Sequence, residues 1–266
     1  MEKFIVAGGC ALRISDSGPK GDKTIVLLHG YLENLSVWDE FTDLLKSQVR
    51  VVALDLPGHG ISQVQGPIHT MEFLADTVHA VLEELLIPKC TVVGHSMGGY
   101  VALAYAEKYP ETLDGLVLFH STPYPDSPGK KALREREVAA VAAGKKELLS
   151  RTAPAMGFAP QNQSRFREEI EGLSELVMLT EEEGIEALLR GMAERKDRSE
   201  VLRNLRVPVL FIFGRGDQYI VAETAERMIR EFPAAQVAWL EHSGHMGFVE
   251  EPEEATRILL EFVSAE

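Results

Sequence analysis

Ser96 stands between two glycines in the segment GHSMGG, which follows an apolar run and precedes a helix-like run. A serine with glycines at this spacing is the G-x-S-x-G pattern, in which the chain leaves a strand and enters a helix within about one residue of the serine. Such a turn forces strained backbone angles, and the glycines lack the Cβ atoms that would keep strand and helix apart. The pattern therefore predicts that Ser96 is a nucleophile lifted out of the sheet at a helix N-terminus.

A serine hydroxyl is a weak nucleophile and needs a base, usually a histidine that a carboxylate orients. In an open parallel sheet such partners lie beyond the carboxyl ends of the strands. His245 lies in a glycine-bounded loop after the last strand-like run, and Asp217 follows the strand-like run before it. The chain order serine, aspartate, histidine is one of the known orders of a catalytic triad. We therefore expect Ser96 as nucleophile, Asp217 as orienting acid and His245 as general base.

Alternatives to two of these residues stay open. His242 is a second candidate base, three residues before His245 but without its pair of flanking glycines. Asp126 follows another strand-like run and is a second candidate acid. Asp217 itself could be a turn residue that binds its own backbone.

Two other histidines are expected to have structural roles. His95 directly precedes Ser96, and we expect its side chain to point toward the sheet and pack there. His59, in the segment PGHG, is expected to order its loop. The sequence has no H-E-x-x-H pattern and no clustered histidine and cysteine spacing, so we expect no catalytic metal and no cofactor.

A negatively charged oxygen that forms during acyl transfer needs two hydrogen-bond donors aimed at one point. The N–H of Met97, directly after the nucleophile, is the first candidate. The second should come from the loop after the first buried parallel strand. Gly30 allows a tight turn there, and we expect the N–H of Tyr31 to be this donor, with the neighbouring Leu32 as the open alternative.

These residues need a scaffold, and the apolar runs predict one. Strand-like runs occupy residues 4–6, 11–15, 24–28, 50–55, 90–93, 113–119, 207–213 and 235–240. Helix-like runs occupy residues 36–46, with Ser36 as the N-cap, and residues 70–86, 100–109, 222–231 and 252–264. Continuous apolar strands that alternate with helices are typical of a parallel sheet covered on both faces. The first two strands should form a β-hairpin, and the fold class is α/β with a mostly parallel sheet.

The alternation of strands and helices breaks between residues 124 and 204, where no strand-like run occurs. Helical apolar spacing instead predicts four helices, at residues 130–143, 145–152, 163–179 and 181–197. We therefore expect one core domain made of residues 1–123 and 205–266, with residues 124–204 as an inserted helical segment.

Composition excludes several classes of protein. The 266 residues are 45% hydrophobic and 26% charged, as in an ordinary globular protein. The formal net charge of −14 argues against a nucleic-acid partner, which needs clustered positive charge. No apolar run approaches membrane-spanning length. Two distant cysteines, Cys10 and Cys90, suggest buried thiols in a reducing compartment. We expect a cytoplasmic protein with a small-molecule substrate, and the sequence gives no indication of its oligomeric state.

Five segments together resemble the signature segments of the α/β-hydrolase superfamily, in order and spacing, from about residue 24 to the C-terminus. They are LHG at 28–30, DLPGHGIS at 55–62, GHSMGG at 94–99, GRGD at 214–217 and SGH at 243–245. The resemblance implies an α/β-hydrolase fold in which the inserted helices form a cap over the active site. The serine at position 96 departs from the branches of the superfamily that use an aspartate nucleophile there, the haloalkane dehalogenases and epoxide hydrolases.

The substrate pocket should lie between the cap and the strand ends. Besides Tyr31, candidate wall residues are His120, Tyr124, Met156, Phe158, Met178, Met192, Ile220 and Met246, although ordinary packing would explain each of them as well. Arginines of the cap (Arg134, Arg151, Arg165 and Arg190) could bind an acidic substrate or simply pair with neighbouring glutamates.

The expected function is a serine esterase that cleaves a small carboxylic ester through an acyl-enzyme, since an apolar cap with methionines favours a substrate with an apolar acyl or alcohol part. Relatives in the superfamily use the same triad for C–C bond hydrolysis, for a menaquinone-pathway elimination, for hydroxynitrile cleavage or for peptidase action. Some members bind a ligand without catalysis. These alternatives stay open.

Overall fold

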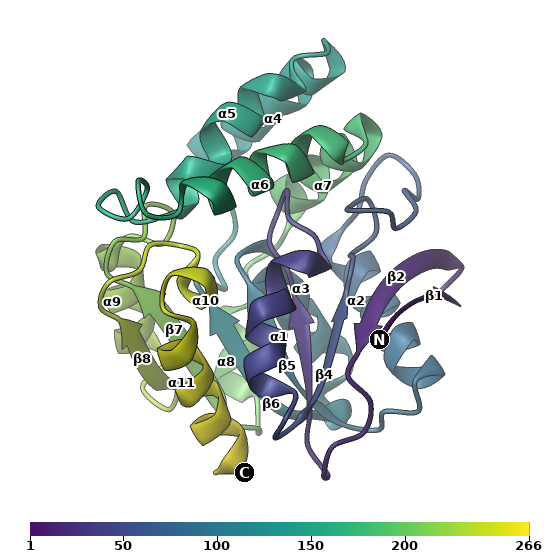
Figure 1. Ribbon diagram of the computed structural model, residues 1–266, viewed down its shortest axis with the longest axis vertical. Coiled ribbons are helices and arrows are strands. Elements are labelled where there is room, and N and C mark those ends of the chain that lie inside the picture. The colour runs from purple at the N-terminus through teal and green to yellow at the C-terminus, as the bar shows by residue number, and fades with distance from the viewer. Residues whose placement is uncertain (266) are drawn as a thin grey trace.

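The computed structural model describes residues 1–265, and its centre is a single sheet of eight strands (Figure 1). The spatial order is β1-β2-β4-β3-β5-β6-β7-β8. Only the pairs β1–β2 and β2–β4 are antiparallel, and every other neighbouring pair is parallel. The strands are β1 (Glu2–Ala7), β2 (Cys10–Asp16), β3 (Thr24–Leu28), β4 (Arg50–Leu54), β5 (Cys90–His95), β6 (Leu113–Phe119), β7 (Val209–Gly214) and β8 (Gln236–Leu240). The expected α/β fold and the N-terminal hairpin are confirmed.

The central strands are apolar along their whole length because helices cover both faces of the sheet. One face packs against α1 (Asp39–Leu45) and α11 (Pro252–Ser264), which are in contact with each other. The other face packs against α2 (Met71–Glu84), α3 (Met97–Lys108), α8 (Ser199–Asn204) and α9 (Ala222–Glu231). In Figure 1, α1 and α11 lie on the near side of the sheet. Burial on both faces fixes the register of the strands, and so fixes which residues emerge at their carboxyl ends.

Capping residues explain several helix boundaries. Thr70, as expected, begins α2 by accepting a hydrogen bond from the N–H of Phe73. The expected N-cap at Ser36 is wrong: Asn34 accepts the capping bond from the N–H of Ser36, and a short 3-10 helix (Leu35–Trp38) precedes α1. Asn34 provides an acceptor two residues before the helix proposed from the sequence, and the chain turns earlier there.

The segment between β6 and β7 is helical, as expected. It contains α4 (Pro128–Ala142), α5 (Lys146–Gly157), α6 (Arg167–Leu179) and α7 (Glu182–Glu194), followed by α8. Helix α5 runs beyond its predicted end and through Pro154. Figure 1 shows α4 to α7 together at one end of the molecule, beyond the carboxyl ends of the parallel strands. We refer to these four helices as the cap helices.

Three short elements had no counterpart in the sequence-based prediction: α8, α10 (Gly247–Glu250) and a second 3-10 helix (Pro110–Thr112). Each has no more than six residues, too few for an apolar period to be visible. Among residues 1–265, no helix is both long enough and apolar enough to cross a membrane.

Candidate active site

Ser96 lies in the turn between β5 and α3 with φ of 50° and ψ of −113°. This left-handed backbone is unfavourable for a residue with a Cβ, so the surrounding packing must hold it in place. The adjacent glycines allow that packing. A Cβ on Gly98 would lie 2.2 Å from the carbonyl oxygen of Leu28, and a Cβ on Gly94 would lie 2.3 Å from that of Gly98. Strand β3, strand β5 and helix α3 therefore meet backbone to backbone beneath Ser96.

Asp217 and His245 come together at the ends of β7 and β8. Nδ1 of His245 lies 2.8 Å from Oδ2 of Asp217. The other carboxylate oxygen accepts hydrogen bonds from the N–H groups of Tyr219 (2.7 Å) and Ile220 (2.9 Å). Asp217 therefore binds its own backbone, as a turn residue would, and also contacts a histidine. Oδ1 therefore has the contacts expected of a turn residue, and Oδ2 has the contact expected of the orienting acid.

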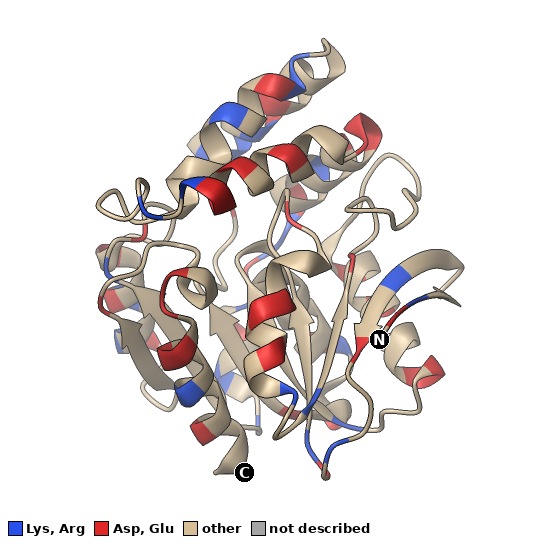
Figure 2. Cartoon of the chain, viewed as in Figure 1, with Lys and Arg blue, Asp and Glu red and all other residues tan. Residues whose placement is uncertain are grey.

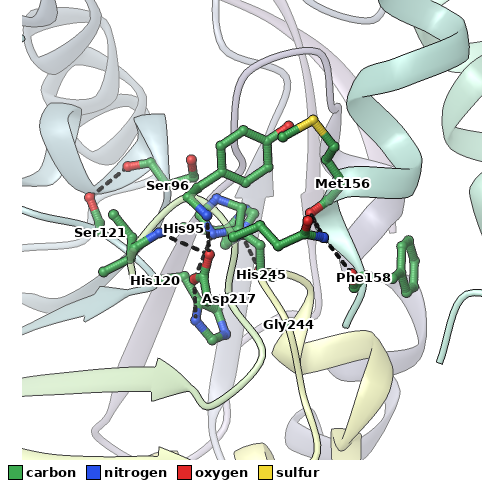
Figure 3. A network of polar contacts seen from close by, with 12 residues as sticks. His95, Ser96, His120, Ser121, Met156, Phe158, Asp217, Gly244 and His245 are labelled. Carbon is green, nitrogen blue, oxygen red and sulfur yellow. Dashed lines mark hydrogen bonds and ion pairs between the residues drawn. The ribbon is translucent and has the colours of Figure 1, made fainter. Parts of the chain in front are cut away.

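The environment of Asp217 keeps its carboxylate charged. Burial raises its pKa, but the positive charge that His245 can carry and the contacts with His120 and His245 outweigh burial and hold the pKa well below its usual range. Oδ2 also lies 3.2 Å from Nδ1 of His120 (Figure 3). Burial lowers the pKa of His120 to about 4, so this second ring is neutral at pH 7.

The loop that carries His245 is tied to the cap helices. The N–H groups of His245 and Met246 both donate to the carbonyl oxygen of Gly157, the last residue of α5, at 2.7 and 3.0 Å. A Cβ on Gly244 would lie 2.4 Å from the N atom of Ala159, which explains the need for glycine before His245. The position of this loop therefore depends on α5.

The alternative acid and base lie elsewhere. Asp126 is buried and forms ion pairs with Arg134 and, at 2.7 Å, with Arg195. His242 is exposed, and its backbone N–H donates to Glu251. Neither residue therefore has the environment that the triad would need.

A cavity of about 180 Å³ opens in front of Ser96 and reaches the cap helices. Ser96 and His245 both line it, together with Tyr31 and Leu32 of the loop after β3. Leu32 has φ of 66°, a strained backbone that turns this loop sharply. Met97, the residue after Ser96, is fully buried at the start of α3. The loop after β3 and the start of α3 thus lie close to the same space, as two oxyanion donors require.

The predicted wall residues divide into two groups. Met192, Ile220 and Met246 line the cavity along with Tyr31. His120, Tyr124, Met156, Phe158 and Met178 are not among its lining residues.

Each of the residues outside the cavity has another environment. His120 lies beside Asp217 and is fully buried. The Tyr124 hydroxyl donates to Glu231, and Phe158 stacks on Phe166. Met156 and Met178 are exposed at the surface. The prediction that these five residues line the pocket is wrong. Four of them belong to the inserted segment, where packing within that segment and against the core directs their side chains elsewhere, whereas His120 follows β6 in the core and contacts Asp217.

The sequence interpretation also missed several lining residues. Glu33 and Tyr219 line the cavity, as do apolar residues of the cap helices, namely Leu149, Ala153, Leu173 and Val177. Glu33 lies two residues after Tyr31 in the loop after β3, and Tyr219 lies two residues after Asp217, so proximity to the candidate site residues could have identified both. The four apolar residues carry no such signal.

One group of potential metal ligands occurs among residues 1–265, formed by His120, Asp217 and His245, with ligand atoms within 4.8 Å of one another. It coincides with the candidate acid and base. Oδ2 of Asp217 already lies between the two rings, and the opposite oxygen is held by the backbone. The arrangement therefore suits proton transfer through the histidine better than metal binding.

Comparisons with known proteins agree with this fold. Residues 25–257 match the sequence model of the alpha/beta hydrolase family. The chain is 31% identical over 264 residues to the dihydrolipoyllysine-residue acetyltransferase component of the acetoin cleaving system of Pseudomonas putida, covering 96% of this chain and 67% of that protein. It is 27% identical over 249 residues to a pimeloyl-[acyl-carrier protein] methyl ester esterase of Aeromonas hydrophila, covering 90% of this chain and 94% of that protein.

A solved structure of a thermophilic esterase from Thermogutta terrifontis, with malate bound, superimposes with a TM-score of 0.93 at 30% identity. The similarity covers 100% of this chain and 98% of that one. The agreement therefore includes the cap helices as well as the sheet. The chain belongs to the alpha/beta hydrolase family.

Proposed function

We propose that this hydrolase cleaves carboxylic esters and that Ser96, His245 and Asp217 form its catalytic triad. The observation that carries the proposal is that Ser96, in a strained turn, lines the same cavity as His245, whose Nδ1 contacts the buried carboxylate of Asp217. With the Nδ1 proton held by Asp217, Nε2 of His245 is unprotonated and able to accept the proton of Ser96.

The reaction proceeds in two steps, acylation and deacylation of Ser96. Oγ of Ser96 attacks the ester carbonyl carbon while its proton passes to Nε2 of His245, and the carbonyl oxygen becomes an oxyanion. The N–H groups of Tyr31 and Met97 donate to this oxyanion. His245 then gives its proton to the departing alcohol, which leaves an acyl group on Ser96. Water then attacks the acyl group while His245 takes its proton, and His245 returns that proton to Oγ of Ser96 as the acyl–serine bond breaks and the acid leaves.

The cavity favours a substrate with an apolar group of moderate size. Most of the side chains that line it are apolar, and its volume is about 180 Å³. Three charged residues, Lys130, Arg134 and Glu137, line it on the side of α4. Nε of Arg134 is taken by Asp126, and Glu137 opposes the remaining positive charge. We therefore propose an uncharged ester. Figure 2 shows basic and acidic residues on the outer cap helices and mostly acidic residues along α6.

Several relatives support ester chemistry without fixing the substrate. The Thermogutta terrifontis protein is named as an esterase, and the Aeromonas hydrophila protein is named for the hydrolysis of a methyl ester. The Pseudomonas putida relative is named as an acetyltransferase component, which also describes transfer of an acyl group. These names have in common that each reaction transfers an acyl group, either to water or to another acceptor.

The test is hydrolysis of p-nitrophenyl butyrate by the purified protein and by the Ser96→Ala variant. We expect the substitution to remove nearly all turnover, about a 10⁴-fold loss or more, with an unchanged circular dichroism spectrum. Ser47→Ala, which changes an exposed serine, is the matched control and should keep full activity. A fluorophosphonate should label the wild-type protein but not Ser96→Ala, because labelling needs an activated serine. Turnover by Ser96→Ala would refute the proposal.

The alternatives named from the sequence remain distinguishable by experiment. A protein that is labelled at Ser96 but inactive on esters of all chain lengths would use its triad for C–C bond cleavage or elimination. A folded protein that is neither labelled nor active would be a binding protein.

A further inference from the structure

His95 occupies the position before Ser96 and lies at the end of β5 with no exposed surface. From the sequence we expected packing against the sheet, and the ring does lie edge-on against Trp38 and Phe248. Both of its nitrogen atoms, however, also have polar partners. Nδ1 lies 3.1 Å from Oε2 of Glu33. Nε2 lies 2.8 Å from the carbonyl oxygen of His245 (Figure 3). The ring therefore makes polar contacts in addition to the expected packing.

The chemistry of these two partners constrains the charge of the ring. A backbone carbonyl oxygen and a carboxylate oxygen only accept hydrogen bonds, whereas a neutral imidazole has a single N–H to donate. With Glu33 ionised, both nitrogens of His95 must therefore carry protons to donate to these two acceptors. Oε2 of Glu33 also accepts the N–H of Gly30 at 2.7 Å, a short distance typical of an ionised acceptor.

The surroundings of His95 stabilise a positive charge. Burial lowers its pKa, but the charge and hydrogen bond of Glu33 outweigh burial, so the pKa of His95 is raised. Burial also acts to raise the pKa of Glu33. The charge and the hydrogen bond of His95 outweigh burial, so the net effect is a lowered pKa for Glu33. Asp217 adds a second negative charge nearby. The other titratable groups that face His95 are histidines, namely His29, His120 and His245.

Two of those three rings add no competing charge at pH 7. Burial lowers the pKa of His29 and of His120, so both are neutral. The aromatic neighbours Trp38, Phe119 and Phe248 surround the ring of His95 without offering another hydrogen bond to its two nitrogens.

We propose that His95 is a buried imidazolium, paired with the carboxylate of Glu33, that acts as a positioning residue for the hydrolytic site. Through Glu33 it holds the loop after β3, because Glu33 also binds the N–H of Gly30, next to the candidate oxyanion donor Tyr31. Through its other nitrogen it holds the backbone of His245. One charged ring thus joins the oxyanion loop to the loop of the general base, directly beneath the nucleophile.

The pair makes the site sensitive to loss of one proton. A neutral His95 keeps a single N–H, so it can hold either Glu33 or His245 but not both. Since the pKa of His95 is raised, both ties are present below that pKa and one is lost as the pH rises through it. The effect on turnover rests on the proposed esterase function, whereas the charge of the ring does not.

Glu33→Gln is the most informative variant, because it keeps the shape of the side chain and a carbonyl oxygen for the N–H of Gly30. It removes the charge that stabilises the imidazolium, so we expect His95 to be neutral at pH 7. We expect kcat for p-nitrophenyl butyrate to fall about tenfold with KM changed less than about twofold, because a misplaced base slows the chemical step. The alkaline limb of the kcat profile should move to lower pH.

The charge of the ring can be read without any activity. Long-range 1H–15N spectra of the full chain labelled with 15N-histidine distinguish a cationic ring, with two protonated nitrogens, from a neutral one. The His95 signals are assigned by their absence in His95→Asn. Wild type should have both nitrogens of His95 protonated at pH 7, and Glu33→Gln should have one bare nitrogen, together with shifted backbone amide signals of His245 and Met246. Glu84→Gln, an exposed glutamate of α2, is the matched control and should change neither spectrum nor kcat.

A neutral His95 in the wild-type spectrum at pH 7 would overturn the imidazolium. A Glu33→Gln variant with a neutral His95 but unchanged kcat, pH profile and amide signals of His245 would overturn the positioning role. If the protein hydrolyses no ester, only the proposed esterase function is refuted. The spectrum of the His95 ring and the amide signals of His245 then still test whether His95 is a cation that positions the His245 loop.

Discussion

Nδ1 of His245 lies 2.8 Å from Oδ2 of Asp217, although the two residues are 28 positions apart and follow different strands. The rest of the Asp217 carboxylate is held by two backbone N–H groups, so the group cannot rotate without losing hydrogen bonds. Because the two donors fix Oδ1, the oxygen that faces His245 is also fixed. The orientation of the imidazole therefore depends on a carboxylate that its own turn holds rigid.

Asp217→Asn should preserve this geometry but reverse the direction of the hydrogen bond between residue 217 and Nδ1 of His245. The amide oxygen would stay on the backbone N–H groups of Tyr219 and Ile220, which leaves the NH₂ group facing Nδ1 of His245. Nδ1 must then accept, so Nε2 carries the proton and cannot act as a base. We expect kcat to fall about 10⁴-fold, as for the same change in other serine triads.

The measurement is kcat on p-nitrophenyl butyrate, with the melting temperature as the check on folding. Asp22→Asn changes an exposed aspartate and should retain wild-type turnover. If Asp217→Asn kept more than about a tenth of the activity, Asp217 would be only a turn residue.

Gly98→Ala tests the close contact beneath Ser96. The new methyl group would lie 2.2 Å from the carbonyl oxygen of Leu28 and 2.7 Å from its carbonyl carbon, and backbone atoms have little freedom to move away. We expect a loss of about 3 kcal/mol or more in the free energy of unfolding, measured by urea denaturation.

The matched control is Gly172→Ala in α6. Gly172 is an exposed helix residue with no atom within 4 Å of an added Cβ. We expect this substitution to stabilise the protein by about 0.5–1 kcal/mol, because alanine has the higher helix propensity. Equal effects of the two substitutions would mean that the contact at Gly98 is not tight.

The strand ends were predictable from sequence, whereas the contacts of the cap were not. The apolar runs of β3 to β7 are buried on both faces, so their ends were visible as the points where polar residues return. This placed Asp217 and His245 correctly in the loops after β7 and β8. Helices α9 and α11 lie at their predicted bounds, the latter because Pro252 occupies its first turn.

Residues whose surroundings come from distant parts of the chain gave no such signal. Glu33 and His95 are 62 positions apart, and nothing in either segment indicates that the two side chains meet. Tyr124 and Phe158 carry the same apolar character as Met192, yet only Met192 lines the cavity. Which face of a cap helix turns toward the site is decided by the packing of α4 on α7 and of α5 on α6, and periodicity within one helix does not contain that information.

His59 should make the protein less stable in acid. It is fully buried in the loop after β4, and its ring lies 4.6 Å from that of His29. Burial, followed by repulsion from His29 and His69, holds its pKa well below the usual value of 6.5. Since the folded protein keeps this ring neutral while the unfolded chain protonates it, stability is lost as the pH falls below about 6.5.

His59→Phe removes the titrating group and should reduce this loss. One histidine kept neutral contributes about 2 kcal/mol of destabilisation between pH 7 and pH 5. We therefore expect the difference in unfolding free energy between these pH values to be about 2 kcal/mol smaller in His59→Phe, measured by urea denaturation at each pH. His242→Gln, at an exposed histidine, should leave the difference unchanged. An identical pH dependence of His59→Phe and wild type would contradict the assignment of a neutral buried ring.

Asp126→Asn should weaken the attachment of the cap helices more than any surface ion pair does. Asp126 lies between the guanidinium groups of Arg134 and Arg195, and Arg195 also stacks on Tyr100 at 3.9 Å. These three charged side chains are at most 10% exposed, so removing the carboxylate leaves two buried cations without their counter-ion. We expect a loss of about 3–5 kcal/mol in the free energy of unfolding.

Glu147→Gln provides the contrast for this prediction, because Glu147 pairs with Arg151 on the exposed side of α5 with both side chains more than 60% exposed. Its loss should be below about 0.5 kcal/mol, since water screens the pair and the two long side chains lose entropy on pairing. Urea denaturation followed by circular dichroism measures both variants. Asp126→Asn should also lower KM for an ester that carries a carboxylate, while KM for a neutral ester changes less. The reason is that Arg134 lines the cavity and would no longer have its charge neutralised by Asp126. Similar small losses in both variants would mean that the carboxylate of Asp126 does not hold the two arginines in solution.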